Sequence, residues 1–265
     1  MPKPIDTAWA FSKPSQKVQW PYNRWYNAHI RKRTRYGYVR EHWDRQISEL
    51  QTLARLKAEK RDPVSVRLSD EDRDVFRRIG KAGVETLMDF LDRVATQDQA
   101  AAFCAEARLA PDELVTILRK VYRYLPQGAQ MRQLVAKDDP VYPYLGHLTS
   151  RRLGHSLALL EVARTREGRT SLAAEAAIPE DDLLDLVLRA DLTRLHLMGG
   201  GMIRTQWALG YRGLDALQKA EPEDYYAACV AHYELASGGM PFDFTMGNVE
   251  AHIARMRDAV SIVEL

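Results

Sequence analysis

Cysteine is scarce in this sequence, and long apolar runs are missing. The 265 residues include two cysteines, Cys104 and Cys229, which lie 125 positions apart within apolar helical patterns. This usage is typical of small core residues in a reducing compartment, with a disulfide or a reactive thiol as the minor alternative. No stretch of about 18 apolar residues occurs, and the start of the chain lacks the charged-then-apolar profile of an export signal. We therefore expect a cytoplasmic protein without a transmembrane segment.

Signatures of catalysis and metal binding are also missing. The seven histidines form no zinc-protease pair with an intervening glutamate, and none stands beside a cysteine pair. There is no Gly-x-Ser-x-Gly elbow, and no lysine follows the glycine-rich stretch as a nucleotide-binding loop requires. Carboxylates such as Asp181 and Asp182 stand at predicted helix starts, where capping explains them. We therefore expect a protein that is not an enzyme and uses neither a metal ion nor a cofactor.

The net charge of +2 conceals an uneven distribution. Residues 1–45 hold ten Lys and Arg against three Asp and Glu, so this segment carries +7 and the rest of the chain carries −5. The same segment holds nine aromatic residues, including four of the five tryptophans. Four prolines forbid a long helix before about residue 22, and no steady period of 2 or 3.6 follows. We therefore predict that residues 1–45 form an extended, aromatic and basic arm.

Such an arm suits a partner, because solvated Trp and Tyr gain free energy when they are buried. Interleaved Arg and aromatic side chains fit a protein assembly through hot-spot anchoring, nucleic acid through stacking and charge, or an anionic membrane surface or membrane complex. The alternative is that the arm wraps its own globular body. The predicted partner-binding residues are Trp9, Trp20, Tyr22, Arg24, Trp25, Tyr26, Arg31, Lys32, Arg33, Arg35, Tyr36 and Tyr38.

The pattern after the arm is helical. Apolar positions from Trp43 onward recur at spacings of three and four, which predicts one amphipathic helix to about Lys60 within a 46–68 segment that ends in a linker. Ser69, followed three residues later by Asp72, predicts a capping box at the start of the next helix. Beyond it, short helical patterns alternate with Gly and Pro. The fold class is therefore all-α, with a first helical unit at 69–140 and a second at 141–265.

An internal repeat relates these two units. Residues 90–121 align with residues 159–190 at an offset of 69, which favours two related helical units. Identical pairs in this alignment are Thr96/Thr165, Glu106/Glu175, Ala107/Ala176, Asp112/Asp181 and Leu114/Leu183.

The repeat has the outline of a helix-turn-helix, but its charges do not suit DNA. The second helix of that device must approach phosphates, whereas here it begins with acidic residues such as Glu180, Asp181 and Asp182. The helix-hairpin-helix is the closer device, because its glycine hairpin binds phosphate through backbone N–H groups. The candidate hairpins are the degenerate stretches LPQGA at residues 125–129 and LMGGG at residues 197–201.

These motifs carry a family resemblance. The stretches SLAAEAAIPEDDLLDLVLRADLTRLHLMGGGMIRT and ALGYRGLDALQKAEPEDYY resemble the bacterial family labelled domain of unknown function 4332, and AGVETLMDFL resembles that family's opening turn. The resemblance covers roughly residues 75–260 and leaves the arm unmatched. It implies two tandem helix-hairpin-helix-like units, in a family without a settled activity.

Two functions follow from the sequence. The first is a non-catalytic helical adaptor or scaffold subunit that docks onto a larger protein assembly through its arm. The alternative is a nucleic-acid-binding protein that uses the arm together with the hairpins. The glycine triplet is then either a plain corner between helices or a phosphate contact formed by Gly199, Gly200, Gly201 and Arg204, with Arg151 and Arg152 as further cations.

Overall fold

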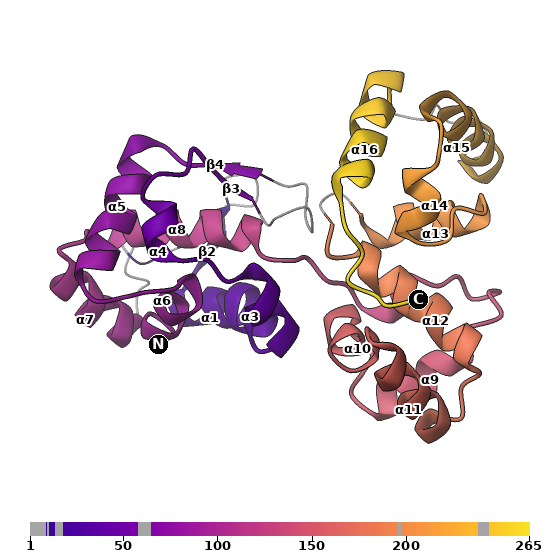
Figure 1. Ribbon diagram of the computed structural model, residues 1–265, viewed down its shortest axis with the longest axis horizontal. Helices are drawn as coiled ribbons and strands as arrows, with labels where there is room; N and C mark the ends of the chain where they lie inside the picture. The colour runs from indigo at the N-terminus through magenta and orange to yellow at the C-terminus, as the bar shows by residue number, and fades with distance from the viewer. Residues whose placement is uncertain (1–8, 10, 14–17, 58–64, 196–197, 238–243) are drawn as a thin grey trace. The chain divides into compact units, whose positions relative to one another are not determined.

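The computed structural model describes residues 9, 11–13, 18–57, 65–195, 198–237 and 244–265 (Figure 1). Helices dominate these residues, and their strands form two short antiparallel hairpins, which confirms the all-α prediction. The chain divides into two compact units. Unit 1 comprises Met1–Ala58 and Val64–Pro126, and unit 2 comprises Glu59–Pro63 and Gln127–Leu265. The division follows Pro126 rather than residue 140, and the segments expected to be a separate arm and linker lie largely in unit 1.

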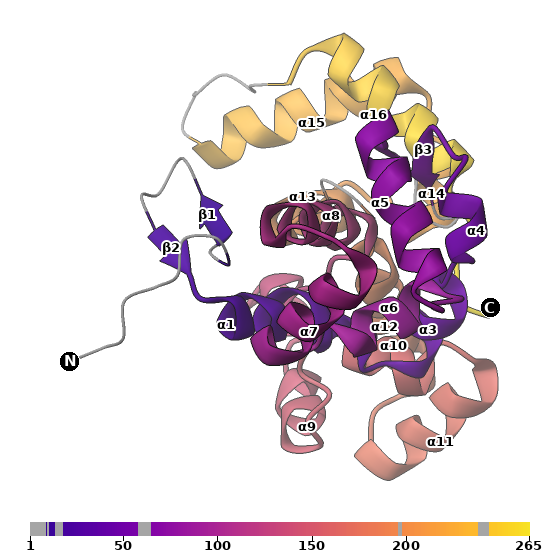
Figure 2. The ribbon, with the colours of Figure 1, turned by 90° about the vertical axis from the view of Figure 1, so that its left-hand side faces the viewer.

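Residues 22–34 and 37–43 are helical, so the prediction of an extended arm is wrong for them, while residues 1–8, 10 and 14–17 of the predicted arm lie outside the described residues. A short hairpin precedes four consecutive helical segments (Figures 1 and 2). The elements are β1 (Phe11–Lys13), β2 (Val18–Trp20), α1 (Tyr22–Tyr26), η2 (Asn27–Arg31), α2 (Lys32–Thr34) and α3 (Gly37–Trp43). Pro21 acts as expected, since α1 begins directly after it and its fixed φ suits a helix start, whereas Pro2, Pro4 and Pro14 lie outside the described residues.

The π-helix η2 explains why the sequence of this segment lacks the ordinary 3.6-residue helical period. The buried residues Tyr22, Tyr26, Ile30 and Thr34 recur every four residues. That spacing exceeds the 3.6 residues of an α-helix because η2 has π-helical bonding, which takes more residues per turn. The pattern therefore drifts off an ideal stripe although the chain is helical throughout residues 22–34.

The amphipathic helix predicted to run to about Lys60 is also wrong. The chain forms only one turn, α4 (Ile47–Leu50), and then a hairpin of β3 (Arg55–Lys57) and β4 (Ser65–Arg67). Gln46 is extended because the backbone of residues 45–47 bonds to that of residues 85–87, and the Asp44 carboxylate accepts from the Met88 N–H at 3.0 Å. These tertiary contacts override a local helical pattern, although Trp43, Ile47 and Leu50 are buried as that pattern requires.

Four helices complete unit 1. They are α5 (Asp70–Lys81), α6 (Leu87–Arg93), α7 (Gln97–Ala107) and α8 (Pro111–Tyr124). The capping box before α5 is confirmed, because the Ser69 hydroxyl accepts from the Asp72 N–H and the Asp72 carboxylate accepts from the Ser69 N–H. The core between these helices holds fully buried aromatic and aliphatic side chains, among them Phe76, Phe90 and Leu118.

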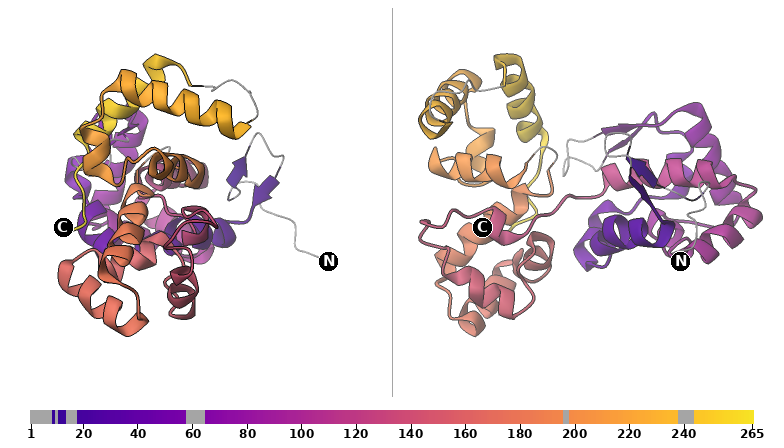
Figure 3. Two further views of the ribbon diagram at one scale, coloured as in Figure 1. Left: turned by 90° about the vertical axis from the view of Figure 1, so that its right-hand side faces the viewer. Right: turned by 180° about the vertical axis from the view of Figure 1, so that it is seen from behind.

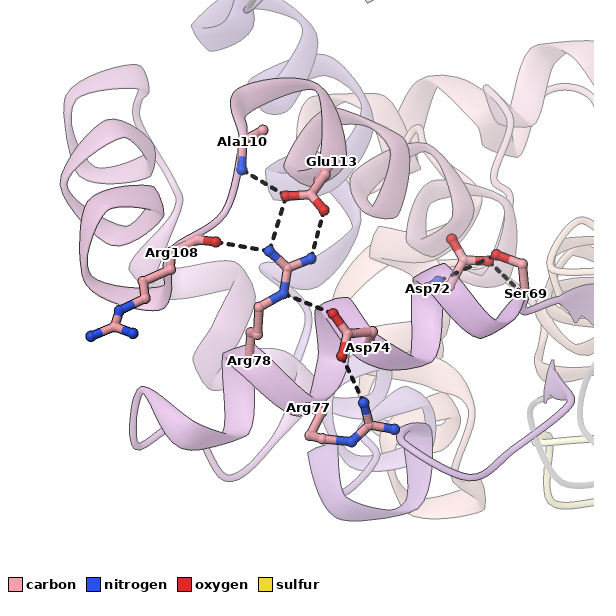
Figure 4. A network of polar contacts seen from close by, with 8 residues as sticks. All are labelled: Ser69, Asp72, Asp74, Arg77, Arg78, Arg108, Ala110 and Glu113. Atoms are coloured by element: carbon pink, nitrogen blue, oxygen red, sulfur yellow. Dashed lines mark hydrogen bonds and ion pairs between the residues drawn. The ribbon is translucent and has the colours of Figure 1, made fainter.

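Arg78 joins α5 to the turn between α7 and α8 (Figure 4). Its guanidinium donates to both carboxylate oxygens of Glu113, at 2.6 and 3.1 Å, and to the Arg108 carbonyl at 2.8 Å. Glu113 also accepts from the Ala110 N–H at 2.7 Å. Arg108 itself adopts a left-handed conformation with φ of 54° at the end of α7. One arginine thus fixes a strained turn and the start of the next helix.

Unit 2 begins with a second copy of this arrangement. Its elements are η3 (Met131–Gln133), α9 (Tyr144–Ser150), α10 (Ser156–Ala163), α11 (Arg166–Ala176) and α12 (Glu180–Leu192). With an offset of 69 residues, α6, α7 and α8 begin where α10, α11 and α12 begin. Ala177 repeats the left-handed turn of Arg108, with φ of 52°. The pairing of residues 45–47 with 85–87 also recurs, between residues 129–131 and 154–156.

The structure adds a third copy that the sequence alignment does not contain. It consists of α13 (Gly200–Ala208), α14 (Leu214–Gln218), α15 (Pro222–Ser237) and α16 (Met246–Asp258), with α15 and α16 in contact (Figures 1 and 3). Gly83, Arg152 and Gly210 have positive φ and each lies four residues before the second helix of its copy. The shared turn defines three copies, α5–α8, α9–α12 and α13–α16, which we call repeats 1, 2 and 3.

The C-terminal residues close unit 2. Arg194 and Asp191 form a fully buried ion pair at 2.6 Å, and Arg194 also donates to the Val260 carbonyl. The Ser261 hydroxyl donates to Asp191 at 3.0 Å, and the Glu264 N–H donates to the Arg164 carbonyl at 2.9 Å. Because buried charges are costly unless they are paired and hydrogen-bonded, this tail is part of the unit 2 core.

Candidate functional site

Most of the rings predicted to grip a partner are buried in unit 1. Relative exposures are 8% for Trp9, 0% for Tyr22, 7% for Trp25, 2% for Tyr26, 7% for Tyr36 and 1% for Tyr38. The Tyr22 and Tyr26 hydroxyls donate to the carbonyls of Val94 and Leu91, at 2.7 and 2.5 Å. Burial accordingly raises the pKa of both phenols. For these rings the structure therefore supports the alternative, in which the segment packs against its own globular unit.

The cationic side chains of the same segment, by contrast, are accessible to solvent. Arg24, Arg31, Lys32 and Arg35 are exposed, and Arg33 is half-buried. Helical spacing explains this division, because the buried side chains, which are rings in α1, Ile30 in η2 and Thr34 in α2, take one side of these helices and leave the charged side chains on the other. In the predicted partner-binding set, most rings are thus part of the core, whereas the cations lie at the surface.

Packing brings the C-terminal half of α8 against these helices. The Tyr122 ring lies 5.8 Å from the Trp25 ring and 4.8 Å from the His29 ring, measured between centroids. The Arg33 guanidinium donates to the Tyr122 carbonyl at 2.9 Å and lies over its ring at 4.3 Å. Burial lowers the pKa of Arg33, while Tyr122 acts in the other direction. Two segments far apart in sequence therefore form one continuous surface.

Neither segment contains a carboxylate. Residues 18–35 and 115–126 hold no Asp or Glu, whereas they contribute Arg24, Arg31, Lys32, Arg33 and Arg35 from the first and Arg119, Lys120 and Arg123 from the second. Lys120 is paired with Asp72. We define the basic face as the exposed or half-buried side chains of Arg24, Arg31, Lys32, Arg33, Arg35, Arg119 and Arg123. Of the acidic residues elsewhere in unit 1, Asp92 is paired with Arg40 and Glu113 with Arg78.

Aromatic rings underlie several cations of the basic face. The Arg24 guanidinium lies 4.6 Å above the half-buried Trp20 ring, and Arg119 lies 5.7 Å from the Phe11 ring. Phe11 in turn stacks on Trp25 at 3.6 Å. Such cation–π contacts hold the guanidinium planes in place without removing their charge. The π-helix η2 contributes His29 to this cluster, within 5.8 Å of the Trp20 ring, and π-helical turns often occur at functional sites.

The glycine triplet lies at the start of α13 in unit 2. Gly199 is the N-cap, and Gly200 and Gly201 form the first turn. Gly200 packs so closely on the backbone that an added Cβ would lie 2.4 Å from the Gln133 carbonyl oxygen. The Arg204 guanidinium donates to that same oxygen. Phosphate binding at Gly199, Gly200, Gly201 and Arg204 stays a prediction, but the arrangement has an evident packing role that ties α13 to η3.

Arg151 and Arg152, the two further cations of the phosphate-binding hypothesis, differ from each other in their contacts. Arg151 donates to the carbonyls of His147 and Glu175, whereas Arg152 is exposed and left-handed, with φ of 63°. They lie at the turn between α9 and α10, in repeat 2.

A pocket of about 530 Å³ in unit 2 gathers Asp139, Asp185, Arg189 and Trp207. Arg189 is 2% exposed and donates to Asp139 and Asp185, both at 2.7 Å. The Trp207 indole donates to Asp185 at 2.7 Å and its ring lies 4.8 Å from the Arg189 guanidinium. These groups satisfy one another, so the network acts as an internal brace between α12 and α13.

Neither cysteine has the surroundings of a reactive thiol. Both are free and buried, and burial raises the pKa of Cys104 to about 11 and that of Cys229 above its usual value. Burial lowers the pKa of His252 to about 4. Among the described residues, no group of three or more His, Cys, Asp or Glu side chains could hold a metal ion. Likewise, none of the described helices combines the length and the apolar character that a membrane crossing needs.

Comparison with protein-family models, with curated proteins and with solved structures found no match to this chain. The resemblance to the domain of unknown function 4332 therefore stays a prediction.

Sequence reasoning missed the contribution of α8 to the basic face. Arg119, Tyr122 and Arg123 lie about a hundred residues from the N-terminal cations and belong to a helix whose first turn is acidic. The signal that could have found them is the acid-free run from residue 115 to residue 126.

Proposed function

We propose that the protein is a non-catalytic helical-repeat adaptor whose unit 1 binds a polyanionic partner through the basic face. The observation that carries this proposal is the juxtaposition of two acid-free segments, residues 18–35 and the C-terminal half of α8. Clustered cations repel each other and attract counterions. A polyanion that displaces those counterions therefore gains binding free energy.

The charges of the two units agree with this proposal. Unit 1 contains 22 Lys and Arg against 15 Asp and Glu, a net charge of +7, whereas unit 2 has −5. A general excess of positive charge would bind anions without specificity, but here the excess is confined to one unit.

Retention on heparin tests the proposal, because heparin supplies dense negative charge without a specific shape. The double variant Arg31→Glu with Lys32→Glu is expected to elute at markedly lower salt than the unmodified protein. The matched control is Arg132→Glu with Lys137→Glu, which makes the same charge change at exposed positions of unit 2. Equal loss of retention in both double variants, or no retention of the unmodified protein, would overturn the proposal.

Docking onto a protein assembly is the second candidate, and a different observation favours it. Leu235 is 87% exposed and Phe244 is 40% exposed, at the end of α15 and just before α16. Exposed large apolar side chains are typical of protein contact surfaces when they cluster. The original reason for this candidate, a set of accessible rings in the N-terminal segment, is weaker because most of those rings are buried. The membrane alternative loses support for the same reason.

A co-purification experiment tests this second candidate. The variant Leu235→Ser with Phe244→Ser is expected to lose a protein that co-purifies with the intact chain in stoichiometric amount, while its retention on heparin stays unchanged. Retention of that protein by the variant would contradict docking through α15 and α16.

A further inference from the structure

We propose that the polyanion bound by the basic face is single-stranded nucleic acid, and that one of its bases stacks at the Arg24–Trp20 pair. The inference rests on the proposed function and deepens it by naming the partner. It is carried by the position of planar groups within the basic face, which charge alone does not require.

Arg24 and Trp20 form a layered pair at the surface. The Arg24 guanidinium lies 4.6 Å above the Trp20 ring, Arg24 is exposed, and Trp20 is half-buried. A guanidinium that already rests on a ring is held in one orientation, so a base can stack on this pair with little further loss of side-chain freedom. Bases stack on aromatic rings and on Arg planes alike, whereas a sulfated sugar or a run of acidic side chains has no flat π-face to offer.

A second pair of the same kind lies on the other side of the aromatic cluster. Arg33 covers Tyr122 at 4.3 Å, and His29 joins the two pairs, since its ring is within 5.8 Å of Trp20 and 4.8 Å of Tyr122. Arg33 is deeper than Arg24 and is committed to the Tyr122 carbonyl. We therefore assign base stacking to the Arg24–Trp20 pair and a supporting role to the Arg33–Tyr122 pair.

The remaining cations are suited to the sugar-phosphate backbone. Arg31 and Lys32 are exposed on η2 and α2, and Arg35 is exposed at the C-cap of α2. Exposed cations on consecutive turns can contact successive phosphates of a flexible strand. The bases of a duplex are stacked on one another inside the helix and are not available to a surface pair, so a duplex would engage only the charges.

The decisive experiment compares two single strands of equal charge. Fluorescence anisotropy of the full-length protein is measured with a labelled 15-nucleotide oligothymidylate and with an abasic strand that has the same number of phosphates. We expect the oligothymidylate to bind about tenfold more tightly, as one stacked base predicts. A 15-base-pair duplex, which offers charge but no free base, is expected to bind less tightly than the oligothymidylate.

Variants assign the difference to the pair. Arg24→Ala and Trp20→Leu are expected to remove most of the advantage of oligothymidylate over the abasic strand, while Trp20→Phe retains part of it. Arg31→Ala is the matched control, because it removes an exposed cation of the same face and should weaken both strands equally. Thermal unfolding of each variant identifies any loss caused by misfolding, and the exposed Arg24 keeps the test open if Trp20→Leu does not fold.

The outcomes separate this inference from the proposed function. Equal affinity for the oligothymidylate and the abasic strand, with intact retention on heparin, would overturn the inference and leave the polyanion proposal standing. Tighter binding of the duplex, or an advantage of oligothymidylate that survives both Arg24→Ala and Trp20→Leu, would also overturn it. Failure to bind any strand or heparin would remove both proposals.

Discussion

Single residues at the copies' turns carry measurable strain. Arg108 and Ala177 end equivalent helices in the left-handed region, at φ of 54° and 52°, where glycine is favoured because it has no Cβ. Neither conformation follows from residue type, since both residues are common inside helices. The alignment of the copies nevertheless locates the turn, because Arg108 and Ala177 follow the starts of α7 and α11 by the same number of residues.

Replacing Ala177 by glycine is expected to stabilise unit 2 by about 0.5–1 kcal/mol, since it relieves the left-handed strain. The neighbouring substitution Ala176→Gly is the control. Ala176 is buried within α11, so glycine there is expected to destabilise by about 1 kcal/mol. Chemical unfolding of both variants measures the difference, and destabilisation by Ala177→Gly would contradict the argument.

The glycine triplet offers a second matched pair. An alanine at 200 would place its Cβ 2.4 Å from the Gln133 carbonyl oxygen and 3.0 Å from its carbon, so Gly200→Ala is expected to destabilise unit 2 by several kcal/mol or to shift α13. An alanine at 201 meets nothing within 4 Å, so Gly201→Ala is expected to be neutral or stabilising by up to about 1 kcal/mol. Equal melting temperatures for the two variants would show that the contact with Gln133 does not constrain α13.

Glu113 gives stability a defined dependence on pH. The hydrogen bonds from Arg78 hold the pKa of Glu113 below its ordinary value of 4.5, so the carboxylate stabilises unit 1 fully above that pH. This contribution is lost as the pH falls through the lower pKa of the folded state, because the folded protein must then accept the proton. We expect Glu113→Gln to be less stable than the unmodified protein near pH 7. The two should converge in acid, which urea unfolding at several pH values checks.

At the scale of helices and strands, local signals predicted starts better than extents. The capping box at Ser69 and Asp72 and the proline before α1 are local, and both act as the sequence indicates. The helix predicted beyond Trp43 fails because the extended pairing of residues 45–47 with 85–87 depends on a segment forty residues away. The π-helix was not recognisable from the spacing of apolar residues, because its wider turn shifts the buried positions.

Only the N-terminal half of the candidate site was predictable from the sequence. The cations of the N-terminal segment are recognisable from charge alone, but which side of each helix they occupy depends on rings that bury themselves against α6, α7 and α8. The contribution of Arg119, Tyr122 and Arg123 is a product of packing, through the contacts of Tyr122 with Trp25, His29 and Arg33.

The C-terminal tail behaves as an element of the core. Removal of residues 260–265 would take the Val260 carbonyl from the fully buried Arg194 and the Ser261 hydroxyl from Asp191. We expect this truncation to destabilise unit 2 by about 3 kcal/mol, the typical cost of leaving a buried charge poorly satisfied. Thermal unfolding measures it. An unchanged melting temperature would mean that water replaces both partners without cost.

For the molecule as a whole, salt is the most informative variable. If five or six cations of the basic face neutralise phosphates of a single strand, the logarithm of the affinity should fall against the logarithm of salt concentration with a slope of about −4. The Arg31→Glu, Lys32→Glu variant should reduce the magnitude of this slope by at least about 1. A slope near zero for the unmodified protein would contradict a phosphate-driven interaction.

The repeated backbone pairing also determines where this protein can be cut. Residues 45–47 pair with residues 85–87, and residues 129–131 pair with residues 154–156, so each of the first two copies is bound to a stretch of chain that precedes its own first helix. A fragment that starts at the first residue of α5 or α9 would leave that backbone partner behind and expose a hydrogen-bonding edge. A version of unit 2 should therefore start by Ala129, and a version of unit 1 should keep Arg45 together with the buried residues Tyr22, Tyr26 and Trp43 that precede it.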